Sequence, residues 1–135
     1  MSQSSNKLEF KTDQLNAPRP YGPYSHAVIA GDFVLLAGQS GRDVVSGKVI
    51  DGDIKAQTAQ AIRVVDNILR GMKLTLRDVV RVTAFLTNME QFSEFNEVYE
   101  SSFSPPYPVR STVEVSKLPF GAVVAIEATA FRGQR

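Results

Sequence analysis

The hydrophobic residues of this chain fall into six short runs and two longer runs with different spacing. The short runs are continuous or alternate every second residue, and they are rich in β-branched and aromatic residues, which is typical of strands. Gly31 and Asp32 separate the second run from the third and predict a hairpin. The runs predict strands at residues 8–12, 27–30, 33–37, 79–86, 110–115 and 122–131.

The two longer runs repeat apolar residues every three or four positions, as a helix does. The first predicts a helix over residues 54–70, with Asp53 as its N-cap and Gly71 at its exit. The second predicts a helix that follows Asn88 and extends to about residue 103. Asn88 and Gln91 have the spacing of a capping box, which supports a helix start there.

The second predicted helix carries one polar residue on its apolar face. Phe92, Tyr99 and Phe103 share that face and predict contacts with the core. Asn96 lies four residues after Phe92 and three before Tyr99, so it lies on the same face. It is therefore either at the margin of the apolar stripe or hydrogen-bonded to a specific partner.

The order of elements, β-β-β-α-β-α-β-β, predicts an α+β fold with a single mixed β-sheet and two helices on one face. Two helices cover only one face of such a sheet, but the runs at residues 33–37, 79–86 and 122–131 are apolar on both sides. The uncovered face of a single chain would be a large exposed hydrophobic patch. The pattern therefore predicts a homo-oligomer, in which copies of the chain cover this face.

Length and composition predict one domain over residues 1–135, with a frayed polar segment at residues 1–6. The 15 basic and 14 acidic residues nearly balance and are scattered, which argues against nucleic acid as a partner. The chain begins with no secretory signal and contains no apolar run of about 18 residues. A cytoplasmic protein without a membrane partner is therefore expected.

The chain contains no cysteine and a single histidine, His26. Disulfides, thiolate catalysis and cysteine metal sites are therefore excluded, and a histidine metal site within one chain is disfavoured. A Ser-His-Asp triad would have to use His26.

Arg110 begins an alternating strand directly after a rigid segment. Pro105, Pro106 and Pro108 forbid a helix and hold the backbone extended. A guanidinium is planar and always charged, so its natural partner is a carboxylate or phosphate bound by two parallel hydrogen bonds. The alternative is an arginine at a strand edge whose charged end lies in water.

Glu127 is the one charged residue of the last predicted strand. A charge in so apolar a strand is costly unless it is paired or open to a cleft. Glu127 could form a structural salt bridge with Arg81 or Arg110, or act as a general acid or base. Gly38 ends an earlier strand, where a missing side chain either makes a turn or lets a ligand approach the backbone.

Several motifs, taken in order along the chain, resemble the RidA/YjgF family of reactive-intermediate (enamine/imine) deaminases. They are Gly22-Pro23-Tyr24, Ala37-Gly38-Gln39, Asn96 within Phe95-Asn96-Glu97-Val98-Tyr99, and Pro108-Val109-Arg110-Ser111 followed by Ile126-Glu127-Ala128. The resemblance extends from about Tyr21 to Phe131. It implies a chorismate-mutase-like α+β protomer in a homotrimer, whose sheets line a central barrel and leave three clefts between subunits. It also implies that each cleft holds Arg110, Tyr24, Asn96 and Glu127, with backbone groups of Gly38, Ser111 and Thr112.

The activity implied by the resemblance is hydrolysis of a 2-imino acid, reached from an enamine such as 2-aminoacrylate, to a 2-oxo acid and ammonia. Arg110 would hold the substrate carboxylate, and Glu127 would orient or activate the attacking water. Tyr24 would supply a wall and a phenol donor, Gly38 would let the main chain close on the ligand, and Asn96 would act as a positioning residue. The expected partners are small 2-imino and 2-oxo acids, and neither a metal nor an organic cofactor is expected.

Three places in the sequence depart from the better-studied deaminase pattern. Ala37 stands where a serine is frequent, Thr112 replaces a common cysteine, and Ser40-Gly41 replaces a common Ile-Pro. The alternative function is a non-catalytic small-carboxylate-binding or regulatory trimer of the same family. Action on RNA is a third interpretation, against which the balanced charge argues.

Overall fold

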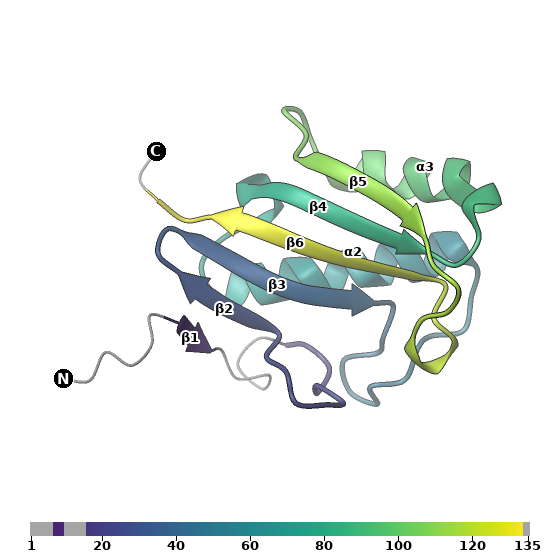
Figure 1. Ribbon diagram of the computed structural model, residues 1–135, viewed down its shortest axis with the longest axis horizontal. Coiled ribbons are helices and arrows are strands. Elements are labelled where there is room, and N and C mark those ends of the chain that lie inside the picture. Colours follow the sequence, from purple (N-terminus) through teal and green to yellow (C-terminus); the bar gives the residue numbers. More distant parts are fainter. Residues whose placement is uncertain (1–6, 10–15, 134–135) are drawn as a thin grey trace.

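The computed structural model describes residues 7–9 and 16–133, which form a single mixed sheet and two helices (Figure 1). Neighbouring strands run antiparallel, except that the strand at one edge is parallel to its neighbour. In order across the sheet the strands are β1 (Lys7–Glu9), β2 (Ala27–Ala30), β3 (Phe33–Ser40), β6 (Val124–Phe131), β4 (Val79–Leu86) and, parallel to β4, β5 (Val109–Glu114).

Two helices, α2 (Ile54–Gly71) and α3 (Phe92–Ser102), lie on the same face of the sheet (Figure 1). Helix α2 packs against β3 and β6 and contacts α3. Three short 3-10 turns join the elements: η1 (Leu76–Asp78), η2 (Met89–Gln91) and η3 (Pro119–Gly121). None of the helices in the described residues is long and apolar enough to cross a lipid bilayer. This arrangement confirms the predicted α+β fold with one mixed sheet and two helices on one face.

The sheet has a buried face and an open face. In β6 every second residue, from Val124 to Ala130, is buried beneath the helices. The residues between them point to the other side, which we call the open face. There Phe33 and Leu35 of β3 are each 44% exposed. An uncovered apolar surface is therefore present where the sequence predicted one.

The sequence predicted the start of α2 correctly, but not the residue at its exit. The Asp53 side chain accepts a hydrogen bond of 3.0 Å from a backbone N–H in the first turn, as expected of an N-cap. Gly71 is still helical, and the left-handed residue is Lys73, with φ of 62°. The Leu74 N–H donates to the Leu69 carbonyl, which completes a Schellman motif and packs Leu74 against the core. The chain therefore reverses at Lys73, two residues after the glycine.

The start of α3 differs from the prediction. Asn88 does not form a capping box with Gln91. Its side chain accepts from the Glu90 N–H at 3.0 Å and caps the turn η2 instead, so that α3 begins only at Phe92. The Gln91 N–H donates to the Asn88 carbonyl at 3.1 Å, and this i→i+3 bond closes a 3-10 turn over the first residues of the predicted helix.

The buried stripe of α3 also differs from the prediction. Phe92, predicted to face the core, is 36% exposed, whereas Phe95 is fully buried. Tyr99 and Phe103 are buried as predicted, and their rings stack 4.5 Å apart. Phe92 opens the helix at the edge of the stripe, whereas Phe95 and Tyr99, four residues apart, occupy its centre.

Strand β3 is longer than predicted and contains a bulge. The prediction ended the strand at residue 37, but pairing with β6 resumes beyond it. The residues on either side of the bulge pair with Ala128 and Ile126, so that Ala37 and Gly38 lie opposite the single residue Glu127. The glycine that was predicted to end the strand therefore lies inside it.

The first strand is only partly covered by the described residues. Strand β1 pairs antiparallel with β2 over Lys7–Glu9. The remainder of the predicted strand, at residues 10–12, and the predicted frayed segment, at residues 1–6, lie outside the described residues.

Candidate functional site

Glu127 lies on the open face, beside the bulge of β3. Its side chain is exposed, and its strand neighbours Ile126 and Ala128 are buried on the opposite side. A methyl group built at Gly38 would meet no atom within 4 Å, so the backbone of the bulge is open to approach. The structure thus places a carboxylate next to accessible main chain, and the binding roles predicted for Gly38 and Glu127 stay predictions.

A small hollow of about 150 Å³ surrounds Glu127 on this face. It is lined by residues of β3, β4 and β6, among them Leu35, Arg81, Thr83 and Thr129. Within the described residues Glu127 forms no salt bridge with Arg81 or Arg110, because the ion pairs found there join other residues. The interpretation of Glu127 as half of a structural salt bridge within one chain is therefore wrong.

Arg110 lies on the opposite side of the sheet. It pairs in register with Val82 of β4, a residue fully buried beneath the helices. Its guanidinium carbon lies 5.7, 5.4 and 4.6 Å from the ring centres of three aromatic residues of α3, respectively Phe92, Phe95 and Tyr99. Within the described part of the chain no carboxylate forms an ion pair with this guanidinium. Cation–π contacts thus hold the side chain while its hydrogen-bond donors stay available.

Tyr99, one of the aromatic residues near Arg110, has a shifted pKa. Burial raises the pKa of the Tyr99 phenol, and the neighbouring positive charge of Arg110 opposes this shift. The Tyr99 hydroxyl is buried and has no hydrogen-bond partner among the described residues. This part of α3 therefore surrounds Arg110 with apolar surface, which strengthens any charge-assisted hydrogen bond that the guanidinium makes.

Two further predicted residues accompany Arg110. Thr112 lies two residues along β5 on the same side, and its buried hydroxyl has no hydrogen-bond partner among the residues described. Asn96 is half-buried on α3, which agrees with a position at the margin of the apolar stripe. Ser111 points to the open face, opposite Thr83.

Tyr24 is joined to the bulge through the only histidine of the chain. The Tyr24 ring lies edge-on to the ring of His26, with centres 5.9 Å apart. The buried His26 ring bonds the Pro18 carbonyl through Nε2, and its Nδ1 accepts from the Gln39 amide at 3.1 Å. Gln39 also donates to the Ala37 carbonyl in the bulge, at 3.2 Å.

His26 is a structural residue and not the base of a triad. Burial lowers the pKa of His26 below its ordinary value of 6.5. The neutral tautomer with the proton on Nε2 satisfies both bonds, because it donates to Pro18 and accepts from Gln39. Both ring nitrogens are thus engaged in holding the segment that carries Tyr24 against β3.

The structure divides the predicted site residues between the two faces of the sheet. Within one chain the Arg110 guanidinium and the Glu127 carboxylate point apart, so a site that contains both needs a second chain. The predicted cleft between subunits stays a prediction. The open-face group consists of Glu127, Gly38 and Ser111, the helix-side group consists of Arg110, Thr112 and Asn96, and Tyr24 lies in the loop before β2.

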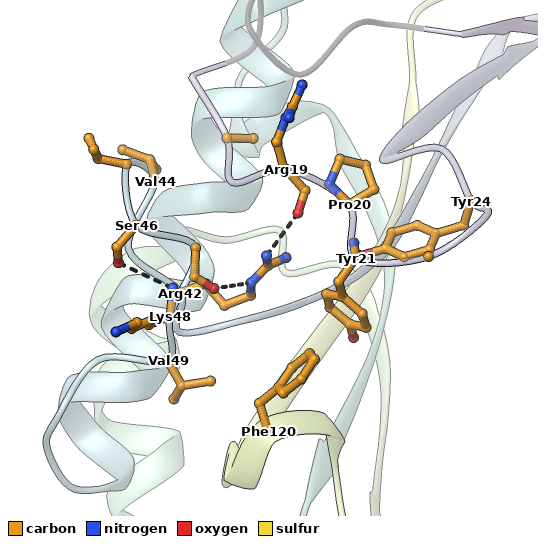
Figure 2. A pocket seen from close by; sticks show the side chains of 14 residues that line it. Arg19, Pro20, Tyr21, Tyr24, Arg42, Val44, Ser46, Lys48, Val49 and Phe120 are labelled. Atoms are coloured by element: carbon orange, nitrogen blue, oxygen red, sulfur yellow. Dashed lines mark hydrogen bonds between the residues drawn. The ribbon is translucent and has the colours of Figure 1, made fainter.

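The sequence interpretation missed a larger groove next to Tyr24, of about 1180 Å³ (Figure 2). Its walls include Tyr21, Phe120 and the loop around Ser46. The buried Arg42 crosses its floor and donates from Nε to the Gly47 carbonyl at 2.7 Å and from Nη2 to the Arg19 carbonyl at 2.8 Å. The only signal in the sequence was the density of aromatic residues in two Pro- and Gly-containing segments, at residues 18–24 and 119–121.

Comparison with known proteins gives consistent matches over most of the chain. Residues 14–132 match the family described as Endoribonuclease L-PSP. The RutC family protein PH0854 of Pyrococcus horikoshii is 44% identical over 117 residues, which cover 87% of this chain and 93% of that protein. A Dermatophagoides farinae protein named 2-iminobutanoate/2-iminopropanoate deaminase is 38% identical over 112 residues, covering 83% of this chain and 88% of that protein.

The fold also matches solved structures. The crystal structure of E. coli TdcF with bound serine has a TM-score of 0.82 and 33% identity, covering 88% of this chain and 95% of that one. The match therefore extends beyond the motifs to the whole arrangement of sheet and helices. The chain belongs to the Endoribonuclease L-PSP family, the RidA/YjgF family that its motifs resemble, in which some relatives are named imine deaminases.

Proposed function

We propose that this protein hydrolyses reactive 2-imino acids, reached from enamines such as 2-aminoacrylate, to 2-oxo acids and ammonia. The observation that carries the proposal is the Arg110 guanidinium, which aromatic rings hold and which no carboxylate of the described residues neutralises. A relative named as an imine deaminase and a neighbour crystallised with the amino acid serine support the same substrate class.

Arg110 binds the substrate carboxylate in this proposal. Two parallel N–H donors on one planar group match the two oxygens of a carboxylate. Binding in this way fixes the imine carbon relative to the protein and removes the entropy cost of orientation from the reaction step. The Thr112 hydroxyl, which has no hydrogen-bond partner among the described residues, and the backbone of Ser111 lie on the same strand and can contact the same ligand.

Glu127 activates the attacking water. The carboxylate takes a proton from water as the water oxygen bonds to the imine carbon, and it passes that proton to the imine nitrogen to give a neutral carbinolamine. The carboxylate then takes the hydroxyl proton of the carbinolamine and delivers it to the nitrogen, so that ammonia leaves as the carbonyl forms and the carboxylate is restored. One water is consumed, and one 2-oxo acid and one ammonia are produced. Tyr24 offers a phenol donor to the same centre.

We infer that each site lies between two copies of the chain in a homotrimer. Arg110 faces the helix side at the edge of the sheet, whereas Glu127 faces the open side. A neighbouring copy that covers the apolar open face would bring its own edge strand toward Glu127. One copy would thus provide Arg110, Thr112 and Asn96, and the other would provide Glu127, Gly38 and Tyr24.

A coupled assay tests the activity. A serine dehydratase releases 2-aminoacrylate, and the appearance of pyruvate is followed with and without this protein. The wild-type chain should accelerate pyruvate formation, and Arg110→Ala should abolish the acceleration while the oligomer stays folded. Arg77→Ala is the matched control, because Arg77 is an exposed arginine of η1 without a proposed role. No acceleration at high protein concentration would refute the deaminase activity.

A mixing experiment tests where the site lies. Arg110→Ala and Glu127→Gln are each expected to be inactive as pure proteins. If the two residues come from different copies, about one cleft in four regains both when equal amounts are unfolded and refolded together. A site within one chain would give no recovery. Sedimentation of the wild-type protein gives the number of copies independently.

A non-catalytic carboxylate-binding trimer is the second candidate function. Ala37 favours it, because alanine offers no hydroxyl where relatives of the better-studied pattern carry serine. In that case pyruvate or serine should raise the melting temperature of the protein, and the dehydratase assay should show no acceleration.

A further inference from the structure

The groove beside Tyr24 is walled by a continuous row of aromatic rings. Tyr21 lies edge-on to Tyr24, with ring centres 5.5 Å apart, and edge-on to Phe120, with centres 4.9 Å apart. Figure 2 shows Tyr21 facing Phe120, with Tyr24 to one side. We call these three residues the aromatic wall. It extends from Tyr24, a residue of the proposed site, into the groove.

Phe120 occupies its position at a cost to the fold. Its φ of 58° is left-handed, which is uncommon for any residue with a side chain and rare for a bulky one. Its side chain is 71% exposed, so little burial offsets this strain. Strain of this kind is found where the surrounding structure or function requires a side chain in one place. Here it keeps an aromatic ring at the mouth of the groove.

Arg42 holds the groove in a preformed shape. Its guanidinium lies 4.8 Å over the Tyr21 ring and is hydrogen-bonded to carbonyls of two separate segments, at Arg19 and Gly47. The two loops on either side of the groove are thus tied together by one buried side chain. Because these contacts occupy Arg42, it acts as a positioning residue for the wall.

The groove is larger than the smallest proposed substrates require. Small-molecule pockets of about 300–1,000 Å³ enclose most of a drug-sized ligand, and this open groove measures about 1180 Å³. The side chain of 2-aminoacrylate is a single methylene group and would leave it empty. A phenyl or branched alkyl group would instead reach the exposed parts of Tyr21 and Phe120.

We propose that the aromatic wall forms a side-chain pocket which gives this protein a preference for 2-imino acids with large apolar, above all aromatic, side chains. The inference rests on the proposed function, since it takes Tyr24 as part of the reaction site. Arg110 selects the carboxylate common to all substrates, and the wall distinguishes their other end. Edge-to-face ring pairs contribute enough to predict a roughly three- to tenfold preference from one additional aromatic contact.

The test compares two imines made in place by an amino-acid oxidase, with catalase present to remove hydrogen peroxide. One imine comes from phenylalanine and the other from alanine, and release of the 2-oxo acid is followed in each case. The measured quantity is the ratio of kcat/KM for the phenylalanine imine to that for the alanine imine. Phe120→Gly should lower this ratio roughly three- to tenfold, and glycine at a left-handed φ should keep the chain folded.

Controls separate this inference from the proposed function. Arg77→Ala changes an exposed residue of η1 that does not line the groove, and it should leave the ratio unchanged. A wild-type ratio that Phe120→Gly and Tyr21→Leu both leave unaltered would overturn the side-chain pocket, even if both imines are hydrolysed. If neither imine is hydrolysed, the deaminase proposal fails, and the pocket is judged by the ratio of Kd for phenylpyruvate to that for pyruvate. If Phe120→Gly leaves this Kd ratio unchanged, the side-chain pocket is refuted. If Phe120→Gly weakens the binding of phenylpyruvate roughly three- to tenfold and leaves the binding of pyruvate unchanged, the side-chain pocket is supported.

Discussion

Replacing Gly41 by alanine tests how closely the end of β3 approaches helix α2. A methyl group at this position would lie 2.8 Å from the backbone oxygen of Gln57 and 2.9 Å from its Cα. Both atoms belong to the main chain of a helix, so they cannot rotate away as the end of a long side chain can. Either the helix or the strand must shift.

The magnitude follows from two opposing effects. Overpacking of a close interface costs about 1–3 kcal/mol. Alanine also lowers the conformational entropy of the unfolded chain, which stabilises the folded state by about 0.4–1 kcal/mol. The free energy of unfolding should therefore fall by about 1–2 kcal/mol. With a urea m-value of about 1–3 kcal/mol/M, the midpoint should move down by roughly 0.5–1 M.

Gly38→Ala, three residues earlier and within β3, is the matched control. A methyl group there would meet no atom within 4 Å, so this variant should be as stable as the wild type or slightly more stable. It should instead weaken pyruvate binding, because the methyl group projects from the bulge that the ligand is proposed to approach. Urea unfolding is followed by far-UV circular dichroism at one protein concentration, since the chain has no tryptophan. Equal midpoints for the two variants would refute the reasoning from backbone contact.

Three further outcomes are expected. Burial lowers the pKa of His26 in the folded state below its ordinary value of 6.5. The contribution of neutral His26 to stability is therefore complete above pH 6.5, and it is lost as the pH falls from 6.5 through the lower folded-state pKa. His26→Gln should make the unfolding midpoint less dependent on pH in that range. Tyr99→Leu removes the ring nearest to the Arg110 guanidinium and should weaken pyruvate binding roughly two- to tenfold in a calorimetric titration, whereas Tyr99→Phe should not. Asp53→Ala removes the N-cap bond of α2 and should cost about 1 kcal/mol in urea unfolding, while the exposed Asp51→Ala should cost less than about 0.5 kcal/mol.

The elements of this fold were predictable where one residue spacing decides the structure. The helical spacing of apolar residues predicted α2, and continuous apolar runs predicted β4 and β6. These patterns indicate a helix or a strand directly, because each pattern follows from burial of the element against a neighbouring layer. The bulge in β3 was not predictable. Its existence depends on pairing with β6, and the sequence around Gly38 fits a strand end equally well.

The sequence proposes which residues form the candidate site, but the face of the sheet on which each lies was not predictable. A period of two gives the relative sides of residues within one strand, and says nothing about which side a given strand turns to the helices. Only the parallel register of β5 with β4 places Arg110 in line with the buried Val82. The contact of Tyr21 with Phe120 joins segments about a hundred residues apart, and no local pattern encodes it.

Strand β5 ends the sheet, and its outer row of backbone donors and acceptors faces away from β4. Such a row of unpaired groups can template the addition of a strand from another chain, which makes an exposed sheet edge a place where aggregation can begin. The prolines at positions 105, 106 and 108 shorten that row, because proline has no N–H to donate. The segment that stiffens the backbone before Arg110 therefore also limits the length of the exposed edge, and it should reduce aggregation of the single chain.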